Sequence, residues 1–498
     1  MESLQLLMGG FGIALQPTNL MFALMGCLLG TMIGVLPGLG PSAGTAVLIP
    51  VTFVLEPTPA IIMLAAIYYG AMYGGTITSV LINTPGEAAS AITCLEGYEM
   101  AKRGRGGAAL AISAIGSFIG GTFATMGLVL VALPLTNLAL KFGPPEFFAL
   151  MVLGLSLVTG LASKSMIRAL MSAIFGLLIA MVGIDPVMGA PRFAFGITEL
   201  LDGFGFVPVI MGVFGISEIL LNAESEARAV FETKVTNLMP TAQDLKDSVG
   251  AIARGTVIGF FLGLIPGVGS VVPAFMSYVA EKKFHKNPEK FGTGVIQGVA
   301  GPETANNSYA NAALIPLFTL GIPGSPTIAV LMGAFMMNGL IPGPFLFVEH
   351  SEFVWAVIAS LYIGNAILLI LNLPLIPLWV SILRVPYSIL FALILGFCVV
   401  GCYSLESSTF DIGVMMVFGM VGYVFKKLDI PLAPLALTLI LGPLMEKGLR
   451  QSLEISRGDF SIFFTRPISL GLLIIATLFV LSASLRVFKQ VRGSDSQV

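Results

Sequence analysis

Charged residues are scarce in this chain of 498 residues, because Asp, Glu, Lys and Arg together make up 10% of it. In soluble proteins such residues make up roughly a quarter. The acidic and basic residues nearly cancel, to a net charge of −2, so the chain lacks the basic surface that nucleic acids require. Histidine is also rare: His285 and His350 are the whole complement, which argues against a metal enzyme. No Gly-x-x-x-x-Gly-Lys-Ser/Thr run is present, so a nucleotide-driven pump is not indicated either.

Apolar residues make up 56% of the chain, and they gather in runs that repeatedly exceed the ~18 residues of a transmembrane helix. We therefore predict an all-α polytopic protein of the inner-membrane type, with about 11–12 transmembrane helices and two re-entrant hairpins. The 58 glycines and 30 prolines predict tightly packed helices, several of them broken.

Two short Pro-Gly stretches interrupt the apolar runs, Leu36–Gly40 and Ile265–Gly269, 229 residues apart. Pro and Gly break a helix and leave backbone groups unpaired, which a bilayer core tolerates only where protein or a water-filled cavity supplies partners. Secondary transporters place their sites at such breaks, near the membrane midplane. We interpret the two stretches as the tips of re-entrant hairpins around a transport site.

The remaining breaks and polar segments divide the chain into two halves of similar plan. The first half, residues 1–222, contains a hairpin over 19–55, a broken helix over 60–98 and scaffold helices over 107–222. The second half, residues 254–446, contains a hairpin over 254–282, a broken helix over 291–338 and scaffold helices over 353–446. A linker over 223–253, predicted to be cytoplasmic, joins the halves, and a C-terminal helix and tail occupy 467–498.

Glycines and prolines recur in the same order in both halves, which indicates a duplication. At a constant offset, Gly30, Gly34, Pro37, Gly38 and Gly40 correspond to Gly259, Gly263, Pro266, Gly267 and Gly269. Farther along, Pro85-Gly86 corresponds to Pro323-Gly324. Inverted repeats with interrupted helices are typical of secondary transporters.

Loop charges predict that the repeat is inverted, because basic residues mark cytoplasmic loops. The loop after the first broken helix carries Lys102, Arg103 and Arg105, whereas the equivalent loop 342–352 carries Glu349 and Glu352 and no Lys or Arg. The same rule places Arg168, Lys426 and Lys427 on the cytoplasmic side. One loop disagrees: residues 446–466 contain Lys447, Arg450, Arg457 and Arg466 although the order of crossings places them outside. Either acidic neighbours offset these charges or the last two crossings are wrong.

The residues at the breaks predict half-helices that begin inside the membrane. Thr84 can cap such a helix, with Pro85 in its first position and Glu87 at the spacing of a capping box, and Ser325-Pro326 has the same cap-then-proline order. The positive N-terminal ends of helices favour carboxylates. The predicted substrate-binding residues are Gly38, Gly40, Ser42, Thr84, Gly86, Gly267, Gly269, Ser270, Asn306, Asn307, Gly324 and Ser325.

Oxygen atoms near the breaks predict a site for a coupling cation, sodium or a proton, and no other cofactor. The predicted ligands are the exposed carbonyls or side chains of Leu36, Thr45, Asn83, Ile265, Glu303 and Gly321. Glu303 is the most informative of them, because carboxylates inside a membrane are rare and usually functional. Two readings of Glu303 stay open, a cation or proton ligand and a structural pair with a neighbouring amide.

Several of these motifs together resemble the TctA family, the large membrane subunit of the tripartite tricarboxylate transporters. The resemblance lies in Gly34–Pro41, Tyr69–Gly75 running into Asn83–Gly86, Gly301–Asn307 and Ile322–Ser325, and it covers nearly the whole chain. It implies a permease of the bacterial inner membrane, with a TctB-like small membrane subunit, a TctC-like periplasmic binding protein and cation-coupled import of citrate or a related carboxylate. An elevator-type mechanism, in which hairpins and broken helices move together, follows by analogy.

We therefore predict a secondary active carboxylate importer rather than an enzyme. An intramembrane enzyme would need a nucleophile–base or metal constellation, and two loop histidines do not provide one. The alternative is a transporter or channel for another small solute that works without a binding protein. The motifs do not select the carboxylate.

Overall fold

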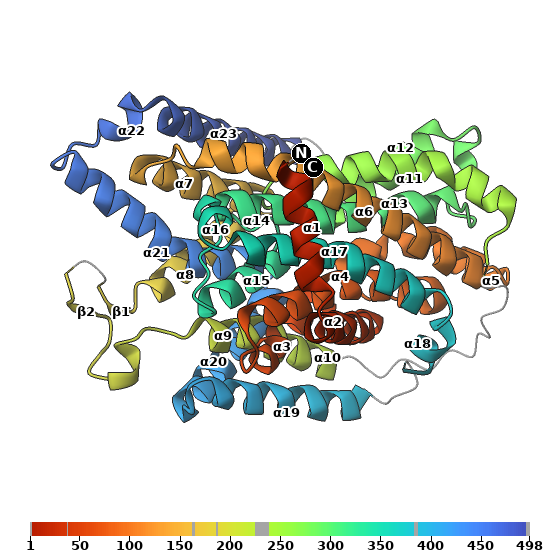
Figure 1. The fold of residues 1–498 in the computed structure, drawn as a ribbon, viewed down its shortest axis with the longest axis horizontal. Coiled ribbons are helices and arrows are strands. Elements are labelled where there is room, and N and C mark those ends of the chain that lie inside the picture. Colours follow the sequence, from red (N-terminus) through yellow and green to blue (C-terminus); the bar gives the residue numbers. More distant parts are fainter. Residues whose placement is uncertain are drawn as a thin grey trace.

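The computed structural model of the chain describes residues 2–494 apart from 37, 162–164, 186–187, 225–238 and 383–386. Pro37, much of the predicted linker and the tail after residue 494 therefore lie outside the described residues. Figure 1 shows an almost entirely helical molecule with one small antiparallel pair of strands at its edge, β1 (Gly183–Ile184) and β2 (Pro191–Arg192), in which Gly183 pairs with Arg192.

The helices of the first half alternate long spans with short turns. They are α1 (Glu2–Ala14), α2 (Pro17–Val35), α3 (Gly40–Thr52), α4 (Pro57–Ile82), the 3₁₀ turn η1 (Ala88–Ala91), α5 (Thr93–Lys102), α6 (Gly106–Ala139), α7 (Pro144–Leu161), α8 (Met166–Ala180) and the 3₁₀ turn η2 (Thr198–Leu200). One continuous segment follows, made of α9 (Phe206–Ile210), the π-helical η3 (Met211–Ile216) and α10 (Ser217–Glu224).

The second half has a similar series of helices. They are α11 (Ala242–Gly263), α12 (Val271–Phe284), the 3₁₀ turn η4 (Pro288–Lys290), α13 (Gln297–Ala312), α14 (Leu314–Leu320), α15 (Pro326–Met337), α16 (Pro344–Glu349), α17 (Ser351–Asn372), α18 (Ile376–Ile382), α19 (Tyr387–Glu406), α20 (Thr409–Lys427), α21 (Leu432–Ile455), α22 (Ile462–Thr465) and α23 (Pro467–Ser494).

Seven helices in the described part of the chain are long and apolar enough to cross a membrane, and six shorter apolar helices accompany them. The prediction of an all-α polytopic membrane protein is therefore confirmed. Two boundaries differ from the prediction. The segment 223–253 is not a linker throughout, because α11 already begins at Ala242, behind a capping box formed by Thr241 and Asp244. The predicted span at 431–446 continues as α21 to Ile455.

Glycines allow α2 and α4 to pack backbone against backbone. Gly26, Gly30 and Gly34 of α2 face the carbonyl groups of Met63, Ile67 and Ala71 of α4. A Cβ atom on Gly30 would lie 2.4 Å from the Ile67 oxygen, closer than any side chain permits. The contact recurs in the second half, where Gly255, Gly259 and Gly263 of α11 face Gly301, Ala305 and Tyr309 of α13. Each of these helix pairs is therefore held at the distance of small-residue membrane interfaces.

The break at Asn83–Glu87, here called break 1, occurs where it was predicted, but it follows a complete crossing. At 26 residues, α4 is about 39 Å long and spans the membrane alone. Asn83 then ends the helix in the left-handed conformation, and the chain folds back until the Gly86 amide donates to the Gly75 carbonyl at 3.3 Å. The break therefore re-enters the protein beside the last turns of α4.

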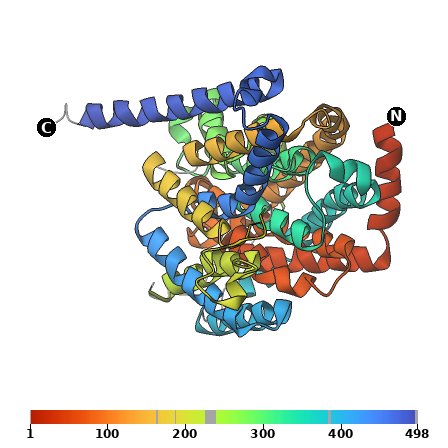
Figure 2. The same ribbon diagram turned by 90° about the vertical axis from the view of Figure 1, so that its left-hand side faces the viewer.

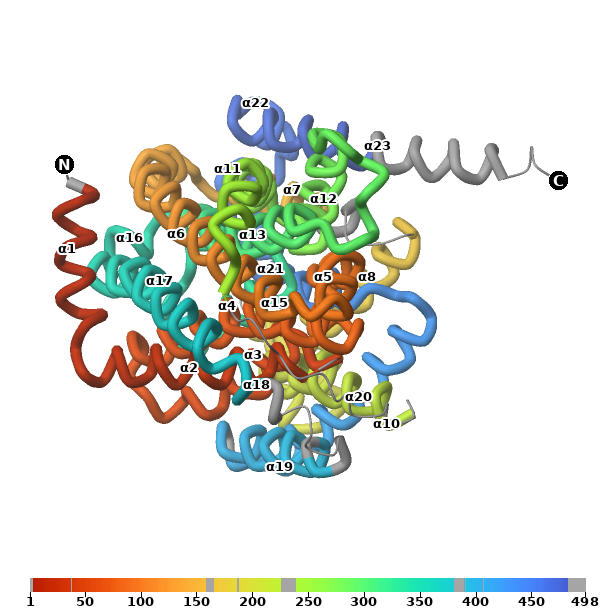
Figure 3. The backbone as a smooth tube through the Cα atoms, turned by 90° about the vertical axis from the view of Figure 1, so that its right-hand side faces the viewer, coloured from red at the N-terminus to blue at the C-terminus, as the bar shows by residue number. Residues whose placement is uncertain are grey.

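Break 2, Gly321–Ser325, has the same geometry at the end of α14. Gly321 is left-handed, and the Ile322 amide donates to the Pro316 carbonyl, as Thr84 donates to Thr78 in break 1. Gly324 then lies against Ala313. The α2–α3 pair and the α11–α12 pair lie on opposite sides of α4 and α13, the helices that lead into the breaks (Figures 1 and 3).

Two further long helices cross between the halves. In the described structure α6 packs along α13, where Gly116 and Gly120 face Thr304, and α17 packs on α4, where Gly364 faces Tyr69. The outer helices form two groups, one of α7, α8, α21 and α23 and the other of α9, η3, α10, α19 and α20. Figure 2 shows α23 extending away from the body on the side opposite the N-terminus.

The glycine contacts predict equal sensitivity in the two halves. We expect Gly30→Ala and Gly259→Ala each to cost about 1–3 kcal/mol of stability, because the new methyl group meets a backbone carbonyl that cannot move away. The measurement is the thermal unfolding temperature of the purified protein in detergent.

Gly12→Ala is the matched control, because nothing lies within 4 Å of a Cβ atom at that helical position. If Gly30→Ala melts at the same temperature as Gly12→Ala, the close packing of α2 on α4 is not present in solution.

Candidate functional site

The tips and breaks of the two halves converge on one another. On one side Ser42, at the start of α3, shares a hydrogen bond of 2.8 Å with Thr327 at the start of α15. On the other side the Gly267 amide donates to the Gly324 carbonyl at 3.0 Å, so Ile265–Gly269 (tip 2) is tied to break 2. In the first half Gly86 of break 1 lies against the Gly34 carbonyl, next to Leu36–Gly40 (tip 1).

Tyr309 connects tip 2 with break 2. Its hydroxyl donates to the Gly324 carbonyl at 2.8 Å and accepts the Gly269 amide at 3.0 Å. The side chain is fully buried on α13. One phenol therefore satisfies the Gly269 amide and gives the Gly324 carbonyl, which also accepts the Gly267 amide, a second partner.

The cap predicted at Ser325 is confirmed. Its hydroxyl accepts the Ile328 amide at 3.2 Å, and Pro326 occupies the first position of α15. The N-terminus of this 12-residue helix therefore lies at the point where Ser42 and break 2 meet.

The cap predicted at Thr84 is wrong. The Thr84 hydroxyl donates to the Ile82 carbonyl instead, and the cap of the next helical turn is Glu87, which forms a capping box with Ser90. The reason is the fold-back after α4: helical structure resumes only at Ala88, so the capping position moves three residues along the chain. Since η1 has only four residues, the positive dipole at its N-terminus is weaker than that of α15.

Two buried carboxylates lie in this region, and neither has a basic partner among the residues that the structure describes. Glu303 on α13 accepts hydrogen bonds from Thr76 of α4, at 2.6 Å, and from Thr93 of α5. Glu87 accepts the Asn306 amide group at 2.6 Å and the Ala89 backbone amide at 3.3 Å. Burial of an unpaired carboxylate is costly, so such groups take up a proton or a cation. Both carboxylates receive hydrogen bonds from the other half of the molecule.

Four polar atoms near the breaks are buried and have no hydrogen-bond partner among the described residues. They are the Tyr68 hydroxyl, the Thr45 hydroxyl and the Oδ1 atoms of Asn306 and Asn307. Tyr68 lies within electrostatic reach of Ser325, Tyr309 and Glu87. Buried polar groups are normally satisfied, so these atoms are candidates for contact with a bound solute or ion.

The six predicted cation ligands lie on different elements of the fold. Glu303 lies in the middle of α13, whereas Gly321 ends the following helix, α14. The Leu36 carbonyl already accepts the Leu39 amide, and Ile265 lies at an exposed surface. Asn83 and Gly321 occupy helix ends rather than the interior. Sequence proximity to a break did not reveal these separations, because each break folds back beside its own helix.

The remaining predicted substrate-binding residues lie in or next to the two tips or on α13, and each makes different contacts. Gly38 and Gly40 of tip 1 and Gly267 and Gly269 of tip 2 all have positive φ angles, which glycine adopts without strain. Ser270 stands before α12 without a side-chain capping bond. Asn307 donates to Ser117 at 2.8 Å.

The hydroxyls that meet Glu303, Thr76 and Thr93, were not among the predicted site residues, and neither were Tyr68 and Tyr309. They stand in apolar helices far from Glu303 in sequence, so only the packing of α4 and α5 on α13 brings them together. Described residues include no group of three or more His, Cys, Asp or Glu side chains able to hold a metal ion. A sodium site would thus rely on neutral oxygens and single carboxylates.

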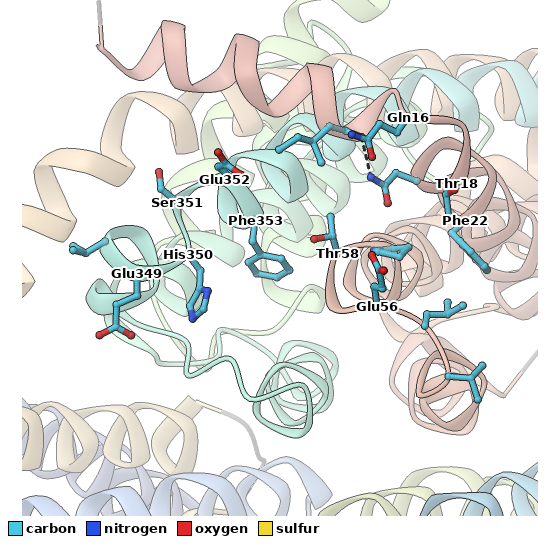
Figure 4. A pocket seen from close by; sticks show the side chains of 16 residues that line it. Gln16, Thr18, Phe22, Glu56, Thr58, Glu349, His350, Ser351, Glu352 and Phe353 are labelled. Carbon is cyan, nitrogen blue, oxygen red and sulfur yellow. Dashed lines mark hydrogen bonds between the residues drawn. The ribbon is translucent and has the colours of Figure 1, made fainter.

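A cavity of about 950 Å³ lies apart from these residues, between the α1–α2 turn, the loop after α3 and the start of α17. Figure 4 shows Glu352, His350 and Phe353 facing Gln16, Thr58 and Glu56 across it. Its lining residues include Glu56, Glu349 and Glu352 and no Lys or Arg. Its charge therefore disfavours an anion, and it is not the candidate site.

One family of known proteins matches most of the chain. The family described as "Tripartite tricarboxylate transporter TctA family" matches residues 20–437. A protein of Agrobacterium vitis, "Uncharacterized 52.8 kDa protein in TAR-I ttuC' 3'region", is 47% identical over 96% of this chain and 95% of its own length. Another from the same organism, "Uncharacterized protein in TAR-II ttuC' 3'region", is 47% identical over 46% of this chain and 96% of its own. No solved structure matches the chain.

The bonds of Tyr309 predict that its hydroxyl holds tip 2 in place. We expect Tyr309→Phe to lower stability by about 1–3 kcal/mol, because the Gly324 carbonyl and the Gly269 amide lose a buried partner. Hydrogen–deuterium exchange of the Gly269 region should rise at the same time.

Tyr403→Phe serves as the control, because Tyr403 is exposed on α19. Exchange at tip 2 that is equal in Tyr309→Phe and the wild type would mean that the hydroxyl does not fix the tip.

Proposed function

The chain belongs to the tripartite tricarboxylate transporter TctA family, and we propose that it is the large membrane subunit of a secondary transporter that imports a small carboxylate. The observation that carries this proposal is the end of α15. A capped, proline-started helix N-terminus lies inside the protein, where tip 1, tip 2 and break 2 meet. Such an end presents a positive dipole to a carboxylate, and the Thr327 amide is the one in its first turn that neither Pro326 nor the Ser325 cap accounts for.

The four unpartnered polar atoms support the same location. The Tyr68 hydroxyl can donate to a substrate oxygen, whereas the Oδ1 atoms of Asn306 and Asn307 can accept from its hydroxyl groups or bind a cation. Neither break contains Lys or Arg. Backbone dipoles, hydroxyls and a cation taken up with the substrate would therefore balance its charge.

We further propose that uptake is coupled to sodium or protons through Glu303 and Glu87. Their carboxylates are buried, receive hydrogen bonds from α4, α5 and α13, and form no ion pair among the described residues. Neutralisation by an external cation would let this part of the protein move in the membrane without an exposed charge. The Asn306–Glu87 bond supplies a direct connection between this pair and the polar face of α13.

The inverted repeat is also part of the proposal, and backbone geometry at equivalent positions supports it. Asn83 and Gly321 end their helices in the same left-handed conformation. The glycine–carbonyl contacts of α2 with α4 recur between α11 and α13 at the offsets that align the two sequences. Random Pro-Gly matches would not reproduce both the contacts and the hydrogen bonds of the breaks.

Ion pairs support the proposed orientation, because they join loops that the charge rule places on the same side. Arg105 pairs with Asp244 and Lys426 with Glu218, all proposed to be cytoplasmic. Outside, Arg450 pairs with Asp185 and Arg466 with Glu146. Acidic partners therefore offset two of the four basic residues in the loop 446–466, which favours the first of the two explanations for its charge.

For the mechanism we propose alternating access in which the tip-bearing helices and the broken helices, about 19–98 and 254–338, move as one part. Glycines let α6 pack on α13 and α17 pack on α4, so we include α6 and α17 in this moving part. The outer helix groups would be the scaffold that contacts a TctB-like small membrane subunit. A TctC-like periplasmic protein would deliver the carboxylate at the inner membrane of a bacterium.

The decisive experiment is uptake of radiolabelled citrate, malate and succinate by proteoliposomes containing the complete transporter. We expect saturable uptake that requires an inward sodium or proton gradient and the binding protein. Glu303→Gln should lower the gradient-driven rate of uptake by at least about ten-fold. The glutamine amide cannot exchange a proton, and because it carries no negative charge it binds a cation less strongly than a carboxylate does.

Glu352→Gln is the matched control, an exposed carboxylate in the cavity of Figure 4. Gradient-driven uptake by Glu303→Gln at the wild-type rate would contradict the coupling role. Uptake without saturation, binding protein or gradient would favour a channel for another small solute.

A further inference from the structure

The two tips differ in how they are covered. Leu36 of tip 1 is 6% exposed, whereas Ile265, its equivalent in tip 2, is 39% exposed. Asn222 of α10 lies directly over Gly38, so that a Cβ atom there would be 2.7 Å from the Asn222 side-chain oxygen. Gly40 and its equivalent Gly269 have no neighbour within 4 Å of a Cβ atom, so the tips differ at Leu36 and Ile265 and not at these glycines. Tip 1 is therefore covered at its first residue, whereas tip 2 is partly exposed there.

The helices that follow the tips show the same asymmetry. On α3, Val47 packs against Gly215 of η3, and Pro50 packs against Gly401 of α19. At the equivalent positions of α12, Met276 is 50% exposed and Val279 is 64% exposed. The outer helices therefore close around the first tip, while tip 2 is accessible.

A pocket of about 510 Å³ lies at break 2, the partner of tip 2. Leu320 and Gly321 form one wall, and the loop 339–346 covers them. The opposite wall comes from the outer helices, with Phe147 of α7 and Lys447 and Gln451 of α21. The pocket thus separates break 2 from the group that contains α7 and α21.

Lys447 is the basic residue of this pocket, and Glu349 and His350 line it as well. Arg450 and Arg466, in the same loop region, are held by Asp185 and Glu146, whereas no ion pair of Lys447 occurs among the described residues. Lys447 is one of the basic residues that the positive-inside rule does not expect on the outer side. It has no ion pair among the described residues and lies beside break 2, which makes it a candidate contact for an anionic ligand.

We propose that this pocket is the outer vestibule through which the carboxylate enters, and that Lys447 attracts it there before it reaches the end of α15. This inference rests on the proposed function, since it names the entrance to that same site. The solute class is a small carboxylate that binds Lys447 through one carboxylate group and lies along the apolar wall. Gly321 and Ile322 then lead toward Ser325, a few residues farther along break 2.

The first test compares Lys447→Gln with Lys447→Arg in proteoliposomes of the complete transporter, using whichever of citrate, malate and succinate the wild type transports. We expect Lys447→Gln to raise KM about five-fold at low salt with kcat within two-fold, because one attractive charge is lost. Lys447→Arg should keep the wild-type KM, and 0.5 M salt should shrink the difference.

Arg457→Gln is the control, because it removes the same charge from an exposed residue on the same face outside the pocket. An unchanged KM in Lys447→Gln, or an equal rise in Arg457→Gln, would overturn the vestibule. If the wild type transports no carboxylate, the proposed function itself fails, and that outcome is read separately.

The second test does not depend on transport. In a Cys94→Ser background the remaining cysteines are buried. A membrane-impermeant thiol reagent added outside should label Ile341→Cys in the pocket, and the carboxylate should protect it, with weaker protection in Lys447→Gln. Val348→Cys, similarly exposed beside the other cavity, should be labelled without protection. Labelling of Ile341→Cys only from the cytoplasmic side, or without protection, would contradict the entrance.

Discussion

Every interruption of a helix in this protein must satisfy its own backbone, because the hydrocarbon core offers no water to do so. The structure meets this constraint by pairing one interruption with another. The Gly267 amide of tip 2 bonds to the Gly324 carbonyl of break 2, and the Tyr309 hydroxyl serves both segments. The irregular segments can therefore exist only together, and their meeting point is the region where a polar solute could be held.

Glycine makes that meeting possible. The close contacts of α2 with α4 and of α11 with α13 bring the tips to the depth of the breaks, and small residues of α6 let it lie along α13. The same packing brings Thr76 and Thr93 onto Glu303. Two buried carboxylates without a basic partner among the described residues then provide a physical reason for cation uptake to accompany the movement of an anion.

Much of the fold could be predicted from the sequence, because its signals are local. Apolar runs predicted the helices and Ser325-Pro326 predicted a helix cap, and the structure contains both. The cap at Thr84 was wrong because a fold-back, which has no local signal, delays the helix to Ala88. The six predicted cation ligands stay a prediction, and the structure places two of them, Glu303 and Gly321, in α13 and at the end of α14, a separation that has no local signal in the sequence. The hydroxyl partners of Glu303 arise from packing alone.

The central claim is that the carboxylate is held between the end of α15 and the two tips. The most direct measurement is an electron cryo-microscopy map of the complete transporter with its carboxylate and sodium. We expect density within hydrogen-bond distance of the Thr327 amide at the start of α15 and of Tyr68 or Asn306. Density confined to the acidic cavity of Figure 4, or elsewhere in the membrane domain, would contradict it.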